Sequence, residues 1–167
     1  MKVSLGKSRL EGQVEVPASK SYTIRALFCA ALASGESEII NPLLCDDTEA
    51  AQEVLRAVGA EVDVEHGIWR VRGGNLHVTD EPLFCADSAA TLRFMTAVCA
   101  LLPGECRLVT GPSLSRRPVA TLIDAMTQLG VECFCEGEVA PVVVRGGGVR
   151  GGLTELPGNI SSQYISA

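Results

Sequence analysis

A lysine, a serine and an arginine stand close together near the start of the chain, at a spacing that suits anion binding. Lys20 precedes Ser21, and Arg25 follows four residues after that serine. Residues four apart share a helix face, and helix N-termini present unpaired amides and a partial positive charge. An ammonium, a hydroxyl and a guanidinium at such a place favour phosphate or carboxylate. The alternative is a capping serine with two solvated cations. The stretch after Arg25 is almost wholly apolar, however, so a solvated arginine fits this helix poorly.

Polar blocks of the same kind return twice, at intervals of about 70 residues. Asp87 and Ser88 lead to Arg93, and a Ser-Ser-Gln segment occupies 161–163. Hydroxyl and amide groups suit phosphate oxygens or ring hydroxyls, although serine at a helix start is also a good cap by itself. The three blocks predict helix starts that gather around an anion.

Two further polar pairs stand at predicted helix starts. Arg116 and Arg117 precede Pro118, a residue typical of the first helical position, where the helix dipole disfavours cations. A bound anion would offset that penalty; two surface arginines in a loop are the alternative. Asp46 and Asp47 suggest a carboxylate pair, but a capping box formed with Glu49 explains them more simply.

Hydrophobic periodicity and turn residues predict two similar units. The first contains a strand at 13–16, a helix at 21–33, a strand at 37–40, a helix from 46 to its cap at Gly59, and a hairpin of 61–65 and 68–72. The second contains a helix at 88–102, a strand at 106–109, a helix from 118 to its cap at Gly130, and a hairpin of 131–136 and 142–145. We expect each unit to follow the order β-α-β-α-β-β.

The two units match each other at fixed places, which is typical of a repeat protein. Arg25 matches Arg93, and the Arg-Gly pair ending at Gly73 matches the pair ending at Gly146. We therefore expect repeats at 17–73 and 74–147, followed by the start of a third at 148–167. Because a repeat cannot bury its apolar face alone, the unfinished third unit indicates a piece of a longer protein.

Composition places the chain among ordinary globular proteins. Its 167 residues are 47% hydrophobic and 20% charged, and the net charge of −6 argues against nucleic acid as a partner. No apolar run approaches the roughly 18 residues that span a bilayer, and the first residues do not resemble a signal peptide. We expect a cytoplasmic protein with no membrane partner.

The seven cysteines (29, 45, 85, 99, 106, 133 and 135) are scattered among apolar neighbours. CxxC spacing is absent and both histidines lie far from Cys133 and Cys135, so zinc or redox chemistry is disfavoured. We expect small, buried, reduced side chains and no metal site.

Four ordered motifs resemble the 5-enolpyruvylshikimate-3-phosphate synthase (3-phosphoshikimate 1-carboxyvinyltransferase) family. They are Pro-Ala-Ser-Lys-Ser-Tyr-Thr-Ile-Arg-Ala-Leu at 17–27, Asp-Ser-Ala-Ala-Thr-Leu-Arg at 87–93, Ser-Arg-Arg-Pro-Val at 115–119 and Gly-Asn-Ile-Ser-Ser-Gln-Tyr-Ile-Ser-Ala at 158–167. Members of this family are more than twice as long as the present chain.

The resemblance implies an α/β (α+β) fold of repeated βαβαββ units, the half of an inverse α/β barrel, with the active site between two domains. Segment 1–16 would then belong to the second domain. The implied reaction transfers an enolpyruvyl group from phosphoenolpyruvate to the 5-hydroxyl of shikimate 3-phosphate, in aromatic amino acid biosynthesis, without cofactor or metal. Full-length members are usually monomeric, whereas a part-length chain can self-associate.

The resemblance also assigns roles to residues that match the motifs. Lys20 would contact both substrates, and Ala89 and Arg117 would bind phosphoenolpyruvate. The residues assigned to shikimate 3-phosphate are Ser21, Arg25, Ser161, Ser162 and Gln163. No catalytic residue is assigned, because the family's main acid/base groups lie in its other half, and we therefore expect no turnover from this chain alone.

One departure and two alternatives accompany the resemblance. The phosphoenolpyruvate loop usually reads Asn-x-Gly, whereas here it reads Asp87-Ser88-Ala89, and the extra methyl predicts weak sensitivity to glyphosate. UDP-N-acetylglucosamine enolpyruvyl transferase shares the fold, but its motif has Lys-Asn where Lys20 precedes Ser21, and it carries a reactive cysteine near its arginine loop. A non-catalytic anion-binding domain is the other alternative.

Overall fold

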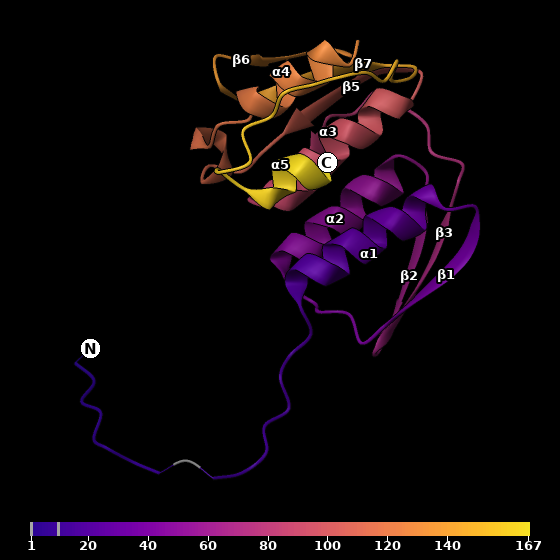
Figure 1. Ribbon diagram of the computed structural model, residues 1–167. Coiled ribbons are helices and arrows are strands. Elements are labelled where there is room, and N and C mark those ends of the chain that lie inside the picture. The colour runs from indigo at the N-terminus through magenta and orange to yellow at the C-terminus, as the bar shows by residue number, and fades with distance from the viewer. Residues whose placement is uncertain (1, 10) are drawn as a thin grey trace.

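Residues 2–9 and 11–18 form an extended segment that leads away from the folded body (Figure 1). The computed structural model describes residues 2–9 and 11–167; Met1 and Leu10 of the predicted segment 1–16 lie outside the described residues. The predicted strand at 13–16 is wrong, since Val14 is 88% and Val16 79% exposed and no strand forms there. Alternating apolar residues make a strand only where a neighbour supplies hydrogen bonds and a surface to pack on.

The first unit folds as two helices and a three-stranded sheet. Its elements are α1 (Lys20–Leu32), β1 (Gly35–Ile40), α2 (Asp46–Ala57), β2 (Glu61–Glu65) and β3 (Ile68–Gly73). The strand order is β1-β3-β2, and both pairings are antiparallel. The predicted helices and hairpin are therefore confirmed, with ends displaced by one or two residues.

The second unit adds a short first strand that the first unit lacks. Its elements are β4 (Leu83–Phe84), α3 (Ala89–Leu101), β5 (Gly104–Val109), the 3-10 turn η1 (Leu114–Arg116), α4 (Ala120–Gln128), β6 (Glu132–Glu136) and β7 (Val139–Gly146), followed by α5 (Ser162–Ser166). The order is β4-β5-β7-β6, with β4 parallel to β5 and the other pairs antiparallel. The order β-α-β-α-β-β is thus complete only in this unit.

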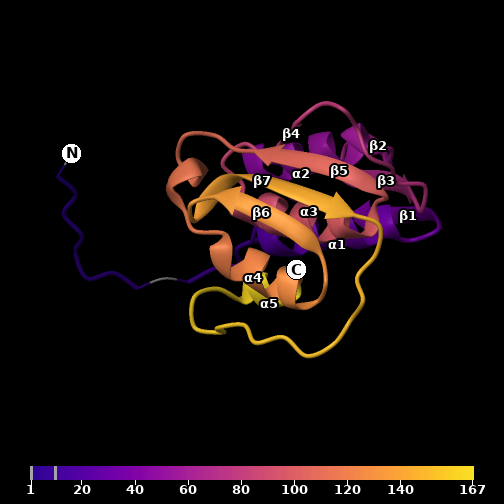
Figure 2. The same ribbon diagram turned by 90° about the horizontal axis from the view of Figure 1, so that it is seen from above.

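The helices of the two units meet between the sheets (Figures 1 and 2). Helices α1 and α2 contact the first sheet, α3 and α4 contact the second, and α3 also packs on α1 and α2. Phe28 of α1 and Phe94 of α3 meet edge to face, with ring centroids 5.6 Å apart. This single helical layer brings the starts of α1 and α3 close together.

Two helix starts differ from the sequence prediction. Cys45, rather than Asp46, is the N-cap of α2, and the hydroxyl of Thr48 accepts a hydrogen bond from the Cys45 amide at 3.0 Å. The predicted Asp46–Glu49 capping box is therefore wrong. Helix α4 begins at Ala120 rather than at Pro118, because Val119 still has the non-helical backbone of a cap.

Matching glycines fix how closely each sheet approaches its helix. A Cβ atom at Gly73 would lie 2.1 Å from the carbonyl oxygen of Ala31, and one at Gly146 would lie 2.1 Å from that of Cys99. Only glycine fits where backbones approach this closely. The repeated glycine is therefore a packing requirement at the end of β3 and of β7.

The cysteines are free thiols. Four are buried, as predicted, whereas Cys45 and Cys135 are half-buried and Cys29 is exposed, so the prediction is wrong for Cys29. The described residues contain no cluster of three or more side chains suited to a metal ion. None of the helices found in 2–9 and 11–167 has both the length and the apolar character to cross a membrane.

Candidate functional site

A cleft of about 470 Å³ lies where the starts of α1 and α3 meet the segment before α5. Its walls also include the start of α2 and the loop that precedes α4. The lining side chains are Lys20, Ser21, Ile24, Asp47, Asp87, Ala89, Ala90, Arg93, Arg117, Ile160, Ser161 and Gln163. Residues about 140 positions apart in the chain thus face one another across a single polar cavity.

Serine caps begin α1 and α3, two of the helices that open onto the cleft. The hydroxyl of Ser19 accepts a hydrogen bond from the Tyr22 amide of α1, and that of Ser88 accepts one from the Thr91 amide of α3, both at 3.4 Å. Ser88 is fully buried and also bonds the Thr91 hydroxyl at 2.8 Å. Since each cap satisfies one amide, the remaining N-terminal amides give this end of the cleft a positive potential.

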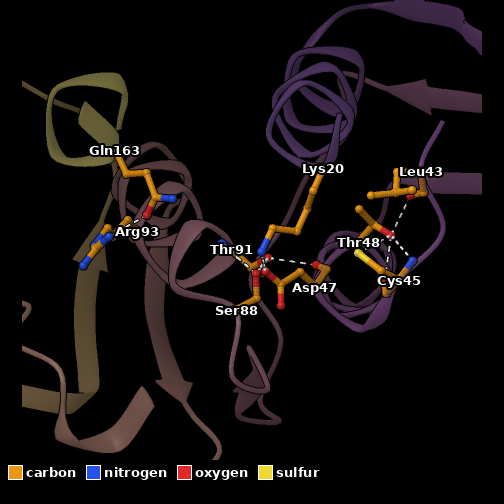
Figure 3. A network of polar contacts seen from close by, with 9 residues as sticks. All are labelled: Lys20, Leu43, Cys45, Asp47, Thr48, Ser88, Thr91, Arg93 and Gln163. Atoms are coloured by element: carbon orange, nitrogen blue, oxygen red, sulfur yellow. Dashed lines mark hydrogen bonds and ion pairs between the residues drawn. The ribbon is translucent and has the colours of Figure 1, made fainter. Parts of the chain in front are cut away.

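Lys20 forms an ion pair with Asp47 across the gap between α1 and α2 (Figure 3). The ammonium nitrogen lies 2.5 Å from the carboxylate oxygen, and the two side chains are 50% and 25% exposed. The Asp47 carbonyl accepts a bond from the Thr91 hydroxyl of α3 at 3.4 Å. Asp47 therefore links three helices and directs Lys20 into the cleft, a role that helix capping did not predict.

Asp87 holds the loop that carries Arg117. Its Oδ1 atom accepts hydrogen bonds from the backbone amides of Ser113 at 3.0 Å and Leu114 at 2.8 Å. A Cβ atom at Gly111 would lie 2.8 Å from the same oxygen, so the loop closes tightly on this carboxylate. Charge-assisted bonds of this kind are stronger than neutral ones, and the loop backbone is fixed relative to the start of α3.

The opposite wall is formed by the segment before α5. The Ser161 hydroxyl accepts a bond from the Gln163 amide at 3.3 Å, and the Gln163 side-chain oxygen accepts one from Arg93 at 2.5 Å. Arg93 also contacts Tyr164, its guanidinium carbon 4.2 Å from the ring centroid. Figure 3 shows Arg93 and Gln163 facing each other from separate helices.

The structure brings six of the eight predicted binding residues to the cleft: Lys20, Ser21, Ala89, Arg117, Ser161 and Gln163. It does not bring Arg25 or Ser162 there. Arg25 bonds the Ser166 hydroxyl at 3.2 Å and lies 5.2 Å from the Phe94 ring centroid, in a separate apolar pocket. Ser162 is exposed at the start of α5. The binding roles of all eight remain predictions.

Asp47 and Arg93 line the cleft although neither is among the predicted binding residues. The local pattern at Asp47 favours helix capping, since its ion-pair partner Lys20 lies 27 residues away. Arg93 belongs to a recognised motif, so a signal was present, but the pairing with Gln163, 70 residues on, gives no local pattern. Long-range pairs of this kind become visible only when the helices are packed.

Known proteins resemble this chain along nearly its whole length. The family model described as EPSP synthase (3-phosphoshikimate 1-carboxyvinyltransferase) matches residues 5–167. A 3-phosphoshikimate 1-carboxyvinyltransferase of Dehalococcoides mccartyi is 50% identical over all of this chain and 40% of its own length. One from Methanothermobacter thermautotrophicus is 43% identical over all of this chain and 41% of its own length. The chain therefore spans about 40% of the length of these relatives.

A solved structure described as EPSP synthase from Acinetobacter baumannii has the same fold. It superimposes with a TM-score of 0.86 over 93% of this chain and 37% of its own, at 23% sequence identity. A second structure of that enzyme gives a TM-score of 0.81 at 22% identity. At this identity the likeness concerns the fold, and it confirms the predicted α/β fold of the enolpyruvyl transferase type.

Proposed function

Because the chain belongs to the EPSP synthase (3-phosphoshikimate 1-carboxyvinyltransferase) family, we propose that it forms one wall of an enolpyruvyl transfer site. The proposed substrates are phosphoenolpyruvate and shikimate 3-phosphate. The chain spans about 40% of the length of the curated relatives that it matches, so the proposal concerns the part of the site that these residues supply.

The proposed reaction makes one C–O bond and breaks another. The 5-hydroxyl loses its proton as its oxygen adds to C2 of phosphoenolpyruvate, and C3 gains a proton, giving a tetrahedral adduct. Loss of a proton from C3 then expels inorganic phosphate and leaves the enolpyruvyl ether. Two phosphates and two carboxylates must be held together, so fixed cations and N–H donors are the main requirement of the site.

A single observation supports this proposal: one cleft of about 470 Å³ collects Lys20, Arg93 and Arg117 from three separate segments. The chain as a whole carries a charge of −6, so this concentration of cations is local. Ser21, Ser161 and Gln163 add uncharged groups for hydroxyl and phosphate oxygens. Such an arrangement suits small, multiply charged ligands.

We propose a division of the cleft between the two substrates. Shikimate 3-phosphate lies against Ser21, Ser161 and Gln163, and phosphoenolpyruvate lies between Ala89 and Arg117, with Lys20 reaching both. The Lys20 ammonium has three donors, so it can keep one bond to Asp47 while it binds phosphate. Arg25 and Ser162 would contribute only if their side chains turned towards the cleft.

The experiment is calorimetric titration of the chain with shikimate 3-phosphate. We expect saturable binding, and a loss of about 10-fold or more in affinity for Lys20→Met, since a hydrogen bond to a charged group contributes about 1.5–3 kcal/mol. Lys7→Met, a matched change in the exposed segment before α1, should bind like the parent. Absence of binding to the parent, or equal loss in both variants, would contradict the proposal.

The two alternative functions predict other results in the same titration. Binding of UDP-N-acetylglucosamine without shikimate 3-phosphate would favour the other enolpyruvyl transferase. Equal affinity for inorganic phosphate and shikimate 3-phosphate would favour a simple anion-binding domain, because the ring hydroxyls would then contribute nothing.

A further inference from the structure

Tyr164 stands at the junction of the two sides of the cleft. Its side chain is 3% exposed, and Arg93 donates a hydrogen bond to its hydroxyl at 3.1 Å. The guanidinium carbon of Arg93 also lies 4.2 Å from the centroid of its ring. The ring is therefore held in one orientation by both stacking and hydrogen bonding.

The Tyr164 hydroxyl donates its own proton to the loop on the other side. It bonds the carbonyl oxygen of Pro118 at 2.6 Å. Pro118 directly follows Arg117, the cation proposed to bind phosphoenolpyruvate. Since Asp87 holds the same loop through the Ser113 and Leu114 amides, the loop is fixed at two places, once from the segment before α3 and once from α5.

The residue before Tyr164 is oriented by the same arginine. Arg93 donates to the side-chain oxygen of Gln163 at 2.5 Å. A guanidinium has no acceptor, so it selects the oxygen end of the amide and leaves the NH₂ end free to donate. Arg93 thus sets Gln163 with one branch of its fork and Tyr164 with the other.

We propose that Tyr164, oriented by Arg93, is a positioning residue that couples the Ser161–Gln163 segment to the loop carrying Arg117. The identity of the ligands in this proposal rests on the proposed function, whereas the coupling rests on the contacts alone. An anion bound against Gln163 orders the Arg117 side of the cleft through the Tyr164–Pro118 bond. The first ligand thereby prepares the site for the second.

The coupling is tested first without ligand, by hydrogen exchange of the Ser115 and Arg117 amides. Tyr164→Phe keeps the ring and removes only the hydroxyl, so we expect these amides to exchange about 5-fold faster, the loss of roughly one hydrogen bond. Tyr22→Phe is the matched control, because Tyr22 is 80% exposed. Unchanged exchange in Tyr164→Phe would overturn the proposal.

The second arm adds shikimate 3-phosphate and separates positioning from simple structural support. In the parent and in Tyr22→Phe, the ligand should slow exchange at both Gln163 and Arg117. In Tyr164→Phe it should slow exchange at Gln163 only. Retained protection at Arg117 would overturn the coupling.

Two further outcomes distinguish a failure of the coupling from a failure of the proposed function or of folding. If the parent shows no response to shikimate 3-phosphate, the proposed function fails, and the ligand-free comparison still decides the coupling. If Tyr164→Phe does not fold, Arg93→Lys takes its place, because lysine keeps the charge but cannot bond Gln163 and Tyr164 with one planar fork. Parent-like exchange at Arg117 in Arg93→Lys would then overturn the proposal.

Discussion

Helices α1 and α3 occupy equivalent places in the two units, yet only one of them directs its arginine into the cleft. Both have 13 residues, and both begin after a serine that caps the amide three residues on at 3.4 Å. The sequence match of Arg25 with Arg93 therefore suggested two arginines in equivalent positions.

The helix starts show that this match is displaced by one residue. Arg25 is the sixth residue of α1, whereas Arg93 is the fifth of α3, where α1 has Ile24. One residue turns a helix by about 100°. Arg93 and Ile24 consequently line the cleft, while Arg25 turns to Ser166 and Phe94. In a repeat protein, distance from the helix cap decides which side chains are equivalent.

The largest expected effect tests where the two units remain alike. Gly73→Ala and Gly146→Ala should each lower the free energy of unfolding by about 3 kcal/mol or more, because the new methyl meets backbone oxygen that cannot move aside. Chemical denaturation would measure this, with Gly6→Ala, in open space, as the control. A large effect at only one of the two glycines would show that the units do not share this packing.

The next effect tests a feature of the second unit alone. Asp87→Ala should destabilise the chain by about 2 kcal/mol, because the Ser113 and Leu114 amides lose their acceptor. Asp87→Asn should cost less, since an amide oxygen can still accept. Thermal unfolding would compare both with Asp63→Ala on exposed strand β2. Equal stability of Asp87→Ala and Asp63→Ala would contradict the role of Asp87.

Buried thiols are another difference between the units. Burial raises the pKa of Cys85 to about 12, whereas an unfolded thiol ionises near 8.5–9. The unfolded state therefore loses this proton first, and stability should fall as pH rises above about 9, by about 1 kcal/mol per unit from this group. Denaturation at pH 8, 9 and 10 would show a smaller fall in Cys85→Ala. An identical fall in stability in the parent and in Cys85→Ala would mean that folding does not raise the pKa of this thiol.

The smallest effect concerns the exposed faces of the two sheets, where the units are again alike. Arg72 pairs with Glu36 and Glu61, and Arg145 pairs with Glu105 and Glu132. The two glutamates also raise the pKa of Arg145. Exposed ion pairs contribute little to the free energy of unfolding, and salt screens them. Arg72→Gln and Arg145→Gln should therefore lower the thermal midpoint slightly, and less at high salt; a large, salt-independent loss in either would contradict this.

Local patterns were sufficient for much of the fold. Four helices and both hairpins follow from apolar spacing together with turn glycines such as Gly59 and Gly67. The strand at 13–16 failed because strand formation depends on a partner that no local pattern can supply. The N-cap of α2 lies one residue before the predicted one. Cys45 and Thr48 form the capping box, and these residue types are less familiar in that role than the aspartate and glutamate beside them.

For the site, the sequence by itself determined which residue types gather at helix starts, and hence predicted an anionic ligand. The family motifs added the predicted assignments of Lys20, Ala89 and Arg117. Only the tertiary structure decided how these groups are held: Lys20 against Asp47, and Arg93 against Gln163 and Tyr164. The physical reason is that helix rotation and packing, rather than spacing along the chain, bring distant side chains within hydrogen-bonding distance.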